Sequence, residues 1–394
     1  MSTPSAGTGV TAACPAHRPA YRHVYLHVPF CARRCSYCDF AIAVRREVPW
    51  RAFADAVARE CDLRGVTGHR DGVSTLYLGG GTPSRLGPSG VRAVFDALLA
   101  RFTLAPDAEV TLEANPEDVT PDAVAAWRAG GVTRLSLGVQ SFDDTLLAWM
   151  HRVHDAAGAE RAVQTARDGG IDAFSLDLIF ATPDRFVRDW DAELERLLSL
   201  APAHVSLYGL TVEPHTPLGR WHARGEEHEA SEDRYAREFL FAHERLSAAG
   251  FEHYEVSNFG RPGHRARHNS AYWHGVPYLG LGPSAHGFDG QTRRWNVDAY
   301  AAWERTLLAG HDPLAGDETL SDDNRAAEAV YLGLRTIDGL SVSTEELDVV
   351  APWVDGGWVT VHHGAHDTRL VCSAQGWLRL DALAAALTAF RSRP

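Results

Sequence analysis

The chain has 394 residues and a formal net charge of -13, with 45% apolar and 23% charged side chains. This composition is usual for a soluble globular protein of two or three domains, and the acidic balance disfavours a general nucleic-acid binder. No apolar run reaches the roughly 18 residues that a membrane-spanning helix needs. All 38 basic residues are arginines, which excludes chemistry that depends on lysine, such as Schiff-base catalysis.

Residues 1–20 are rich in Ala, Pro, Ser and Thr and lack the basic start and apolar stretch of a signal peptide. We therefore expect a disordered N-terminal tail and a cytoplasmic protein without a transmembrane segment. Thiols stay reduced in the cytoplasm, so neighbouring cysteines are expected to bind a metal in preference to forming a disulfide.

The first predicted strand, 23–29, leads directly into a loop with three cysteines in the spacing C-x3-C-x2-C: Cys31, Cys35 and Cys38. Three thiolates so close together predict a metal site, and iron–sulfur clusters are held by cysteine thiolates. Zinc sites more often pair two C-x2-C halves far apart, although a zinc ion completed by a histidine such as His27 remains an alternative. A four-iron cluster would keep one iron open to a small molecule.

Strand-like and helix-like segments alternate from residue 21 to about residue 250. The predicted strands are 23–29, 75–79, 109–113, 134–139, 173–180 and 204–210, and the helical periods are 50–64, 90–102, 121–129, 155–168, 187–200 and 232–249. Six βα units in a row predict a parallel sheet, either as a barrel or as a doubly wound sheet.

Polar and glycine-rich clusters follow nearly every predicted strand. They include Gly79–Gly81, Glu113, Gln140 and, inside the fifth strand, Asp177. Barrel active sites are built at the carboxyl ends of the strands, so we expect these clusters to converge at one mouth. Three successive glycines also predict close approach of a ligand, with free N–H groups that would hold a carboxylate or an amino acid's polar head.

The pattern changes after residue 255. Residues 256–296 are expected to be loop-like, and a helical stretch is expected from about residue 316 to the C-terminal helix at 380–390. We therefore predict a core domain at 21–255, a connecting region at 256–315 and a small C-terminal domain at 316–394.

Together these motifs resemble the radical S-adenosylmethionine (SAM) superfamily and, within it, the anaerobic coproporphyrinogen dehydrogenase-like family that includes HemN and HemW. The resemblance rests on Val28-Pro-Phe-Cys31, Gly79–Ser84, Glu113-Ala-Asn-Pro116, Arg134-Leu-Ser-Leu-Gly-Val-Gln-Ser141 and Tyr254-Glu-Val-Ser-Asn258. It implies an α/β fold: a partial (β/α)6 TIM-type barrel with a smaller, mostly helical, winged-helix-like C-terminal domain.

Two features favour one branch of this family. HemN-type dehydrogenases carry a further cysteine two positions after the third, where this chain has Phe40. HemW proteins have Asp-Phe there and an H-N-x-x-Y-W motif linked to haem binding, as in His268-Asn269-Ser-Ala-Tyr272-Trp273. The resemblance implies a haem chaperone that delivers haem to acceptor proteins. An oxygen-independent coproporphyrinogen III dehydrogenase is the alternative, so whether the chain is an enzyme stays open.

The resemblance also implies roles for single residues. Cys31, Cys35 and Cys38 would hold a [4Fe–4S] cluster whose open iron binds SAM. The SAM pocket would be lined by Tyr25, Gly80, Gly81, Thr82 and Glu113. In the dehydrogenase, certain positions contact SAM or a second SAM. They correspond in this chain to Tyr37, Gln140, Arg152 and Asp177.

The haem reading has support from the residues themselves. Histidine is a normal axial ligand of haem iron, and arginines pair with carboxylates such as propionates. His268 is therefore the expected ligand, near Arg265 and Arg267, with Tyr272 and Trp273 as packing aromatics. The alternative is that His268 caps a loop and Trp273 belongs to the core.

Basic side chains surround the cysteine loop at Arg33, Arg34, Arg45 and Arg46. They would suit docking of an acidic electron donor such as a flavodoxin or ferredoxin, and a solvated basic loop is the alternative reading. A nucleic-acid partner is not expected from the acidic balance.

Overall fold

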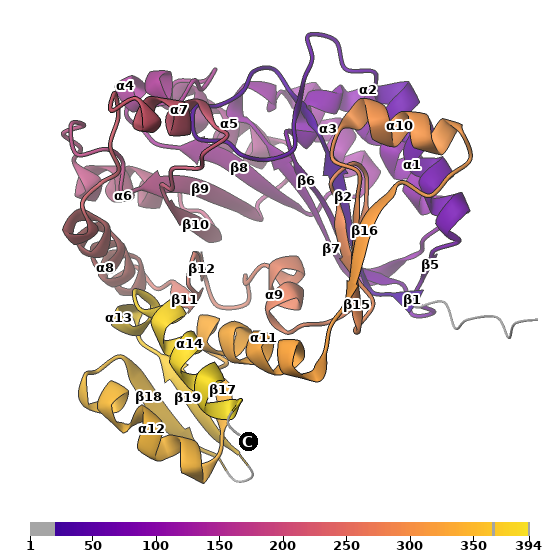
Figure 1. Ribbon diagram of the computed structural model, residues 1–394. Helices are drawn as coiled ribbons and strands as arrows, with labels where there is room; N and C mark the ends of the chain where they lie inside the picture. The colour runs from indigo at the N-terminus through magenta and orange to yellow at the C-terminus, as the bar shows by residue number, and fades with distance from the viewer. Residues whose placement is uncertain (1–19, 365–366, 393–394) are drawn as a thin grey trace, which may run out of the picture.

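Six parallel strands form the centre of the computed structural model, which describes residues 20–364 and 367–392 (Figure 1). They are neighbours in one nine-stranded sheet, in the order β2-β6-β7-β8-β9-β10. This confirms the predicted parallel sheet. Their bounds are β2 His23–Val28, β6 Val73–Gly80, β7 Leu104–Ala114, β8 Arg134–Gln140, β9 Phe174–Phe180 and β10 His204–Gly209. The expected tail lies outside the described residues apart from Ala20.

Helices follow the strands and lie on the outer side of the curved sheet (Figure 1). Their starts are fixed by local chemistry: Thr120 accepts a hydrogen bond from the amide of Ala123 at the start of α3, and Asp155 accepts one from Gly158 at the start of α5. The bounds are α1 Trp50–Arg64, α2 Gly87–Leu99, α3 Pro121–Gly130, α4 Asp144–Trp149, α5 Ala156–Asp168, α6 Trp190–Ser199, α7 Pro217–Ala223 and α8 Glu232–Ala248.

The sheet continues past residue 255, into the segment that the sequence predicts to be loop-like. On one edge β13 (Leu279–Leu281) pairs in parallel with β2, and on the other β12 (Asn258–Gly260) pairs antiparallel with β10 and with β11 (Glu252–Glu255). These strands are too short to show an apolar period, which is why the sequence did not reveal them. The same segment also contains α9 Arg267–Trp273, β14 His286–Phe288 and β15 Thr292–Asn296.

The C-terminal part is a small module of helices and one antiparallel ribbon, as expected, but its helices begin only at Asp322 because residues Leu314–Thr319 form a strand. Its three strands are ordered β17-β19-β18. The module contacts the barrel through an ion pair between Arg335 and Glu255 and through the ring of Trp377, which packs on His253. The bounds are α11 Asp322–Arg335, β17 Leu340–Val342, α12 Thr344–Asp355, β18 Val359–His363, β19 Thr368–Cys372, α13 Ala374–Trp377 and α14 Leu380–Arg391.

Short elements complete the described chain, and none of its helices is long and apolar enough to cross a membrane. They are β1 Ala20–Tyr21, β3 Phe30–Cys31, β4 Ala43–Val44, β5 Thr67–Gly68, η1 Pro83–Leu86, η2 Pro116–Asp118, α10 Tyr300–Leu308 and β16 Leu314–Thr319.

Polar side chains fill the inside of the barrel at the amino ends of its strands. His204 Nδ1 bonds Ser175 Oγ at 2.9 Å and its Nε2 bonds the Tyr254 hydroxyl at 2.8 Å. Thr75 Oγ1 bonds His268 Nδ1, which α9 brings in from outside the strands, at 2.7 Å. We call Thr75, Ser175, His204, Tyr254 and His268 the amino-end plug. Their hydrogen bonds tie β6 to α9, and β9 through β10 to β11, at the amino ends of the strands.

Candidate functional site

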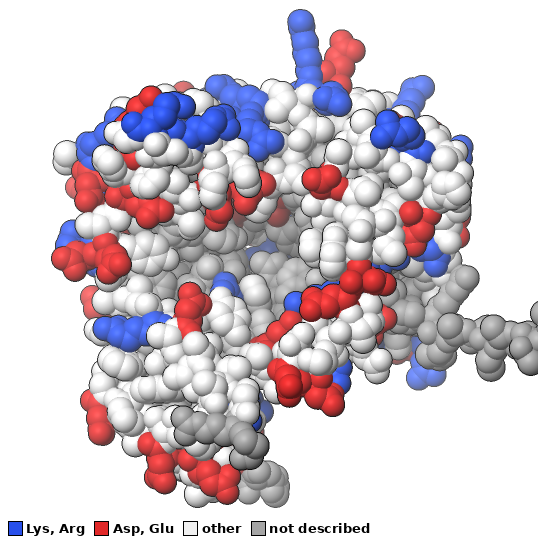
Figure 2. Space-filling view, viewed as in Figure 1, with Lys and Arg blue, Asp and Glu red and all other residues white. Residues whose placement is uncertain are grey.

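A cavity of about 450 Å³ lies at the carboxyl ends of the barrel strands, opposite the plug. We call it the mouth cavity; its walls include the cysteine loop, Glu113, Asp177 and Tyr208. Figure 2 shows that the molecule is hollowed on the open side of the curved sheet, above α9. The predicted convergence of strand-end residues therefore produces a real cavity.

All three loop thiols line the mouth cavity. Cys31 Sγ lies 3.4 Å from Thr82 Oγ1, and Arg152 Nη1 donates to Cys35 Sγ at 3.6 Å. Burial raises the pKa of Cys31 to about 11 and raises that of Cys38, so metal binding must displace these protons. The thiols share one wall, and in the described part of the chain no three His, Cys, Asp or Glu side chains converge on a single ion.

A zinc site in the cysteine loop would need His27 as its fourth ligand, but the imidazole of His27 is engaged in other hydrogen bonds. Its Nδ1 bonds the Tyr25 hydroxyl at 3.1 Å and its Nε2 bonds the carbonyl of Ala41 at 2.9 Å. With both nitrogens engaged, His27 has no free lone pair for zinc. The donor set facing the cavity is three thiols, which fits the three protein-bound irons of a cubane with one open iron.

Arg152 forms the buried cationic wall beside the thiols. Its Nη2 donates to Asn115 Oδ1 at 2.6 Å and to the carbonyl of Gly138 at 2.7 Å. Its Nε is buried and has no partner within the described chain. Arg152 thus places a positive charge beside Cys35 Sγ, and its unpartnered Nε is a free donor at the site.

The glycine turn Gly79–Gly81 works differently from the sequence expectation of free amides. The amide of Gly80 donates to Glu113 Oε2 at 3.0 Å, and that of Gly81 donates to the carbonyl of Val28 at 2.8 Å. A Cβ on Gly81 would lie 2.7 Å from the backbone of Pro29, and Gly80 has φ +107°. The glycines therefore allow the turn to pack against the strand that leads into the cysteine loop. Gly80, Gly81 and Thr82 still line the mouth cavity.

Glu113 is the carboxylate at the centre of this wall. It accepts hydrogen bonds from the Tyr77 hydroxyl at 2.7 Å and from Gly80. Burial raises its pKa to about 7, so near neutral pH it is present in both protonation states. A cationic amine in the cavity would favour the ionised form.

The other residues predicted to contact SAM also face the mouth cavity, with one exception. Tyr37, Gln140, Arg152 and Asp177 line it. Gln140 has φ +67°, an uncommon backbone state for a residue other than glycine. Asp177 accepts from Ser136 Oγ at 2.7 Å, and burial raises its pKa. Tyr25 does not line this cavity.

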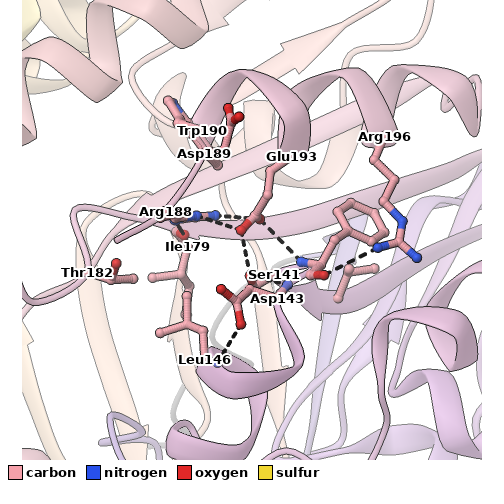
Figure 3. A network of polar contacts seen from close by, with 12 residues as sticks. Ser141, Asp143, Leu146, Ile179, Thr182, Arg188, Asp189, Trp190, Glu193 and Arg196 are labelled. Carbon is pink, nitrogen blue, oxygen red and sulfur yellow. Dashed lines mark hydrogen bonds and ion pairs between the residues drawn. The ribbon is translucent and has the colours of Figure 1, made fainter. Parts of the chain in front are cut away.

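A buried ion pair between Arg188 and Glu193 lies beside Ser141 (Figure 3). Ser141 follows Gln140, which lines the mouth cavity, and we call this segment the rim. Arg188 donates twice to the carboxylate of Glu193, at 2.7 Å each, and once to the carbonyl of Ile179 at 2.7 Å. Glu193 also accepts from Ser141 Oγ at 2.9 Å. The side chains of Arg188 and Glu193 are only 1% and 8% exposed. This network ties the ends of β8 and β9 to α6.

A second cavity, of about 370 Å³, lies beside the mouth cavity. We call it the side cavity; its lining includes Tyr25, His27, Ser284 and His286. Four residues line both cavities and form the wall between them: Asp39, Phe40, Gly80 and Glu113.

The HNxxYW motif forms α9 and lines neither cavity. His268 is 1% exposed, and its Nε2 bonds the Tyr272 hydroxyl at 2.8 Å while its Nδ1 bonds Thr75. Burial lowers its pKa to about 3. Arg335 stacks on Trp273 at 4.2 Å, and Trp273 Nε1 is buried without a partner in the described chain. His268 could bind iron only after exchanging a bond to Thr75 or Tyr272.

Sequence reasoning missed several residues that line the mouth cavity, among them Ser136, His151 and Tyr208. Ser136 and Tyr208 stand at inward-facing positions of β8 and β10, two residues from Gly138 and Ser206. The strand period of two would have found them once one inward residue of each strand was known.

Comparison with known proteins gives consistent likenesses. Residues 25–197 match the family described as the radical SAM superfamily. A protein named Heme chaperone HemW from Mycobacterium tuberculosis (strain ATCC 25618 / H37Rv) is 40% identical over 368 residues, covering 91% of this chain and 93% of that protein. A protein of the same name from Escherichia coli (strain K12) is 36% identical, covering 67% and 69%.

A solved structure shares the whole fold. The coproporphyrinogen III oxidase HemN from Escherichia coli, described as a radical SAM enzyme, superposes with a TM-score of 0.77 at 22% identity. The match covers 95% of this chain and 91% of that one. At this identity the likeness concerns the fold.

Proposed function

The chain belongs to the HemW family of the radical SAM superfamily, and from this premise we propose that it is a haem chaperone that holds a [4Fe–4S] cluster and SAM. The observation that carries the proposal is the similarity to proteins named haem chaperones over nine tenths of both chains. The three thiols on the wall of one cavity support the cofactor part.

In this proposal the mouth cavity holds both resident groups. Cys31, Cys35 and Cys38 would ligate three irons, and SAM would bind the open iron. Such a cluster supplies one-electron chemistry when SAM is bound. Glu113 and Asp177 offer acceptors to the amine and hydroxyls of SAM, while Tyr37 and Gln140 border the same space. Gly80, Gly81 and Thr82 shape the wall, and Tyr25 supports it from the side cavity.

Haem is cargo in this proposal, bound within residues 256–315 and passed to haem-requiring proteins in the cytoplasm. The HNxxYW residues His268, Tyr272 and Trp273 contribute to that region, although both nitrogens of His268 are engaged. His286, in the same region, is exposed.

Reduction of the cluster would need a donor, and the exposed arginines near the loop suit an acidic flavodoxin or ferredoxin. Arg33, Arg45 and Arg46 are exposed, while Arg34 donates to the carbonyl of Cys38. A cluster reduction rate that falls as salt rises would support this docking. A rate independent of ionic strength would contradict it.

The test of the main proposal uses full-length protein purified without oxygen. Iron, sulfide and SAM are quantified, hemin is titrated while the Soret band is followed, and loaded protein is mixed with a haem-free acceptor. We expect saturable hemin binding and transfer to the acceptor. Absence of saturable binding in protein that carries its cluster would refute the chaperone function.

The dehydrogenase alternative is kept for one observation, the fold shared with the HemN structure. Incubation with reductant, SAM and coproporphyrinogen III under nitrogen decides it. Protoporphyrinogen IX formed over several turnovers would replace the chaperone proposal with an enzyme.

A further inference from the structure

A haem iron takes a histidine nitrogen that has a free lone pair, and the structure ranks the histidines of residues 256–315 by that criterion. Thr75 and Tyr272 occupy both nitrogens of His268 in the interior. His274 bonds the carboxylate of Asp338 at 3.2 Å. His264 and His311 are exposed but line neither cavity.

His286 differs from all four. It stands on β14, is exposed, and lines the side cavity. Neither of its ring nitrogens has a hydrogen bond within the described chain, while its ring stacks on Trp295 at 5.9 Å and 22°. Partial burial and Arg293 lower the pKa of His286, which keeps the imidazole neutral and its lone pair available.

The side cavity around His286 presents aromatic side chains beside the candidate ligand, although Asp39 and Glu113 also line it. Phe40 is an aromatic side chain left 65% exposed on the shared wall, and Tyr25 also lines the cavity. Ser284, two residues before His286, has φ +60°, a state that costs free energy and clusters at functional sites. Arg293 lies close by on β15, but its guanidinium pairs with Glu328 at 2.6 Å, so a propionate would have to compete with that carboxylate.

On these grounds we propose that the cargo haem binds at the side cavity with His286 as its iron ligand and Phe40 packed on the macrocycle. This rests on the proposed chaperone function and names its cargo site. His268 instead has a structural role: its hydrogen bond to Thr75 holds α9 against β6. Because Phe40 and Glu113 belong to both cavities, the cargo lies next to the cofactor site.

The test is a hemin titration of the full chain, followed by absorption and electron paramagnetic resonance spectra. We expect His286→Ala to weaken hemin binding at least tenfold and to remove the imidazole-ligated spectrum, with recovery on adding free imidazole. His286→Cys should shift the Soret band to that of a thiolate-ligated haem. Phe40→Ala should weaken binding severalfold without changing the spectrum.

Two controls separate ligation from folding. His264→Ala, an exposed histidine of the same region, should titrate like the wild type. Tyr272→Phe frees His268 Nε2 from its partner: an unchanged affinity supports the proposal, whereas a gain in affinity would point to His268. Wild-type spectra in His286→Ala and His286→Cys overturn the His286 assignment and leave the chaperone function standing. No hemin binding by the wild type refutes the function itself.

Discussion

The two ends of the barrel interior carry the same kinds of polar side chain but differ in how completely those side chains are hydrogen-bonded. In the amino-end plug, His204 and His268 have both ring nitrogens bonded. In the mouth cavity, Glu113 and Asp177 also accept hydrogen bonds, but Arg152 Nε is buried without a partner among the described residues. Satisfied polar groups make a rigid support, and unsatisfied ones make a binding site. Substitutions in the plug should therefore lower the stability of the fold, whereas substitutions in the mouth cavity should lower cofactor binding.

The largest expected effect is at the mouth. Cys38→Ser should remove the cluster, so iron drops from about four per chain to near zero, while the melting temperature of cluster-free protein stays close to wild type. Cys372→Ala, a buried cysteine of the C-terminal module, is the matched control and should keep its iron. Iron retained by Cys38→Ser would show that the mouth is not the cluster site.

The ion pair under the rim should dominate stability. Arg188→Met leaves Glu193 charged and buried without its partner, which costs about 3–5 kcal/mol. Urea unfolding of cluster-free protein measures this. The double variant Arg188→Met/Glu193→Leu should recover much of the loss because no charge is left unpaired. A loss below about 1 kcal/mol in the single variant would mean that the pair is solvated in solution.

A smaller loss of stability is expected in the plug, with no loss of iron. Thr75→Val removes the hydroxyl that bonds His268 Nδ1 and His23 Nδ1. The buried nitrogen left behind costs about 1–3 kcal/mol by unfolding. We expect Thr75→Val to keep its full iron content, in contrast to the iron-free Cys38→Ser. That result would show that the plug stabilises the fold and that the mouth cavity holds the cluster. Iron loss in Thr75→Val would contradict that separation.

The smallest effect is a pH dependence. The folded-state pKa of Glu113 is raised to about 7, so this carboxyl stabilises the fold below its ordinary pKa, and that stability is lost as pH rises through 7. Glu113→Gln has no such charge, and its stability relative to wild type should improve by roughly 1–2 kcal/mol from pH 6 to pH 8. Unfolding of cluster-free protein at both pH values measures it. A constant difference would place the Glu113 carboxylate in solvent.

The parallel strands and the convergence of their ends could be predicted from the sequence. Both follow from the apolar periodicity of single strands and helices, which is visible in short stretches of sequence. Strand β9 (Phe174–Phe180) and α1 (Trp50–Arg64) lie almost where the periods place them. The state of His268 could not be predicted, since its burial depends on Thr75, which is distant in sequence. The engaged amides of Gly80 and Gly81 likewise depend on Glu113 and Val28, which belong to other segments.

The place of β13 has a consequence for how the chain is made. Strand β2, which leads into the cysteine loop, pairs on one side with Leu279–Leu281, and Gly282 then donates to the buried carboxylate of Glu60. On a ribosome that adds roughly 5–20 residues per second, β2 keeps an open edge for tens of seconds after it emerges. An open edge strand invites pairing with other chains. The wall beside the thiols is thus complete only late in synthesis, and cluster insertion is expected to follow release of the barrel's last strand.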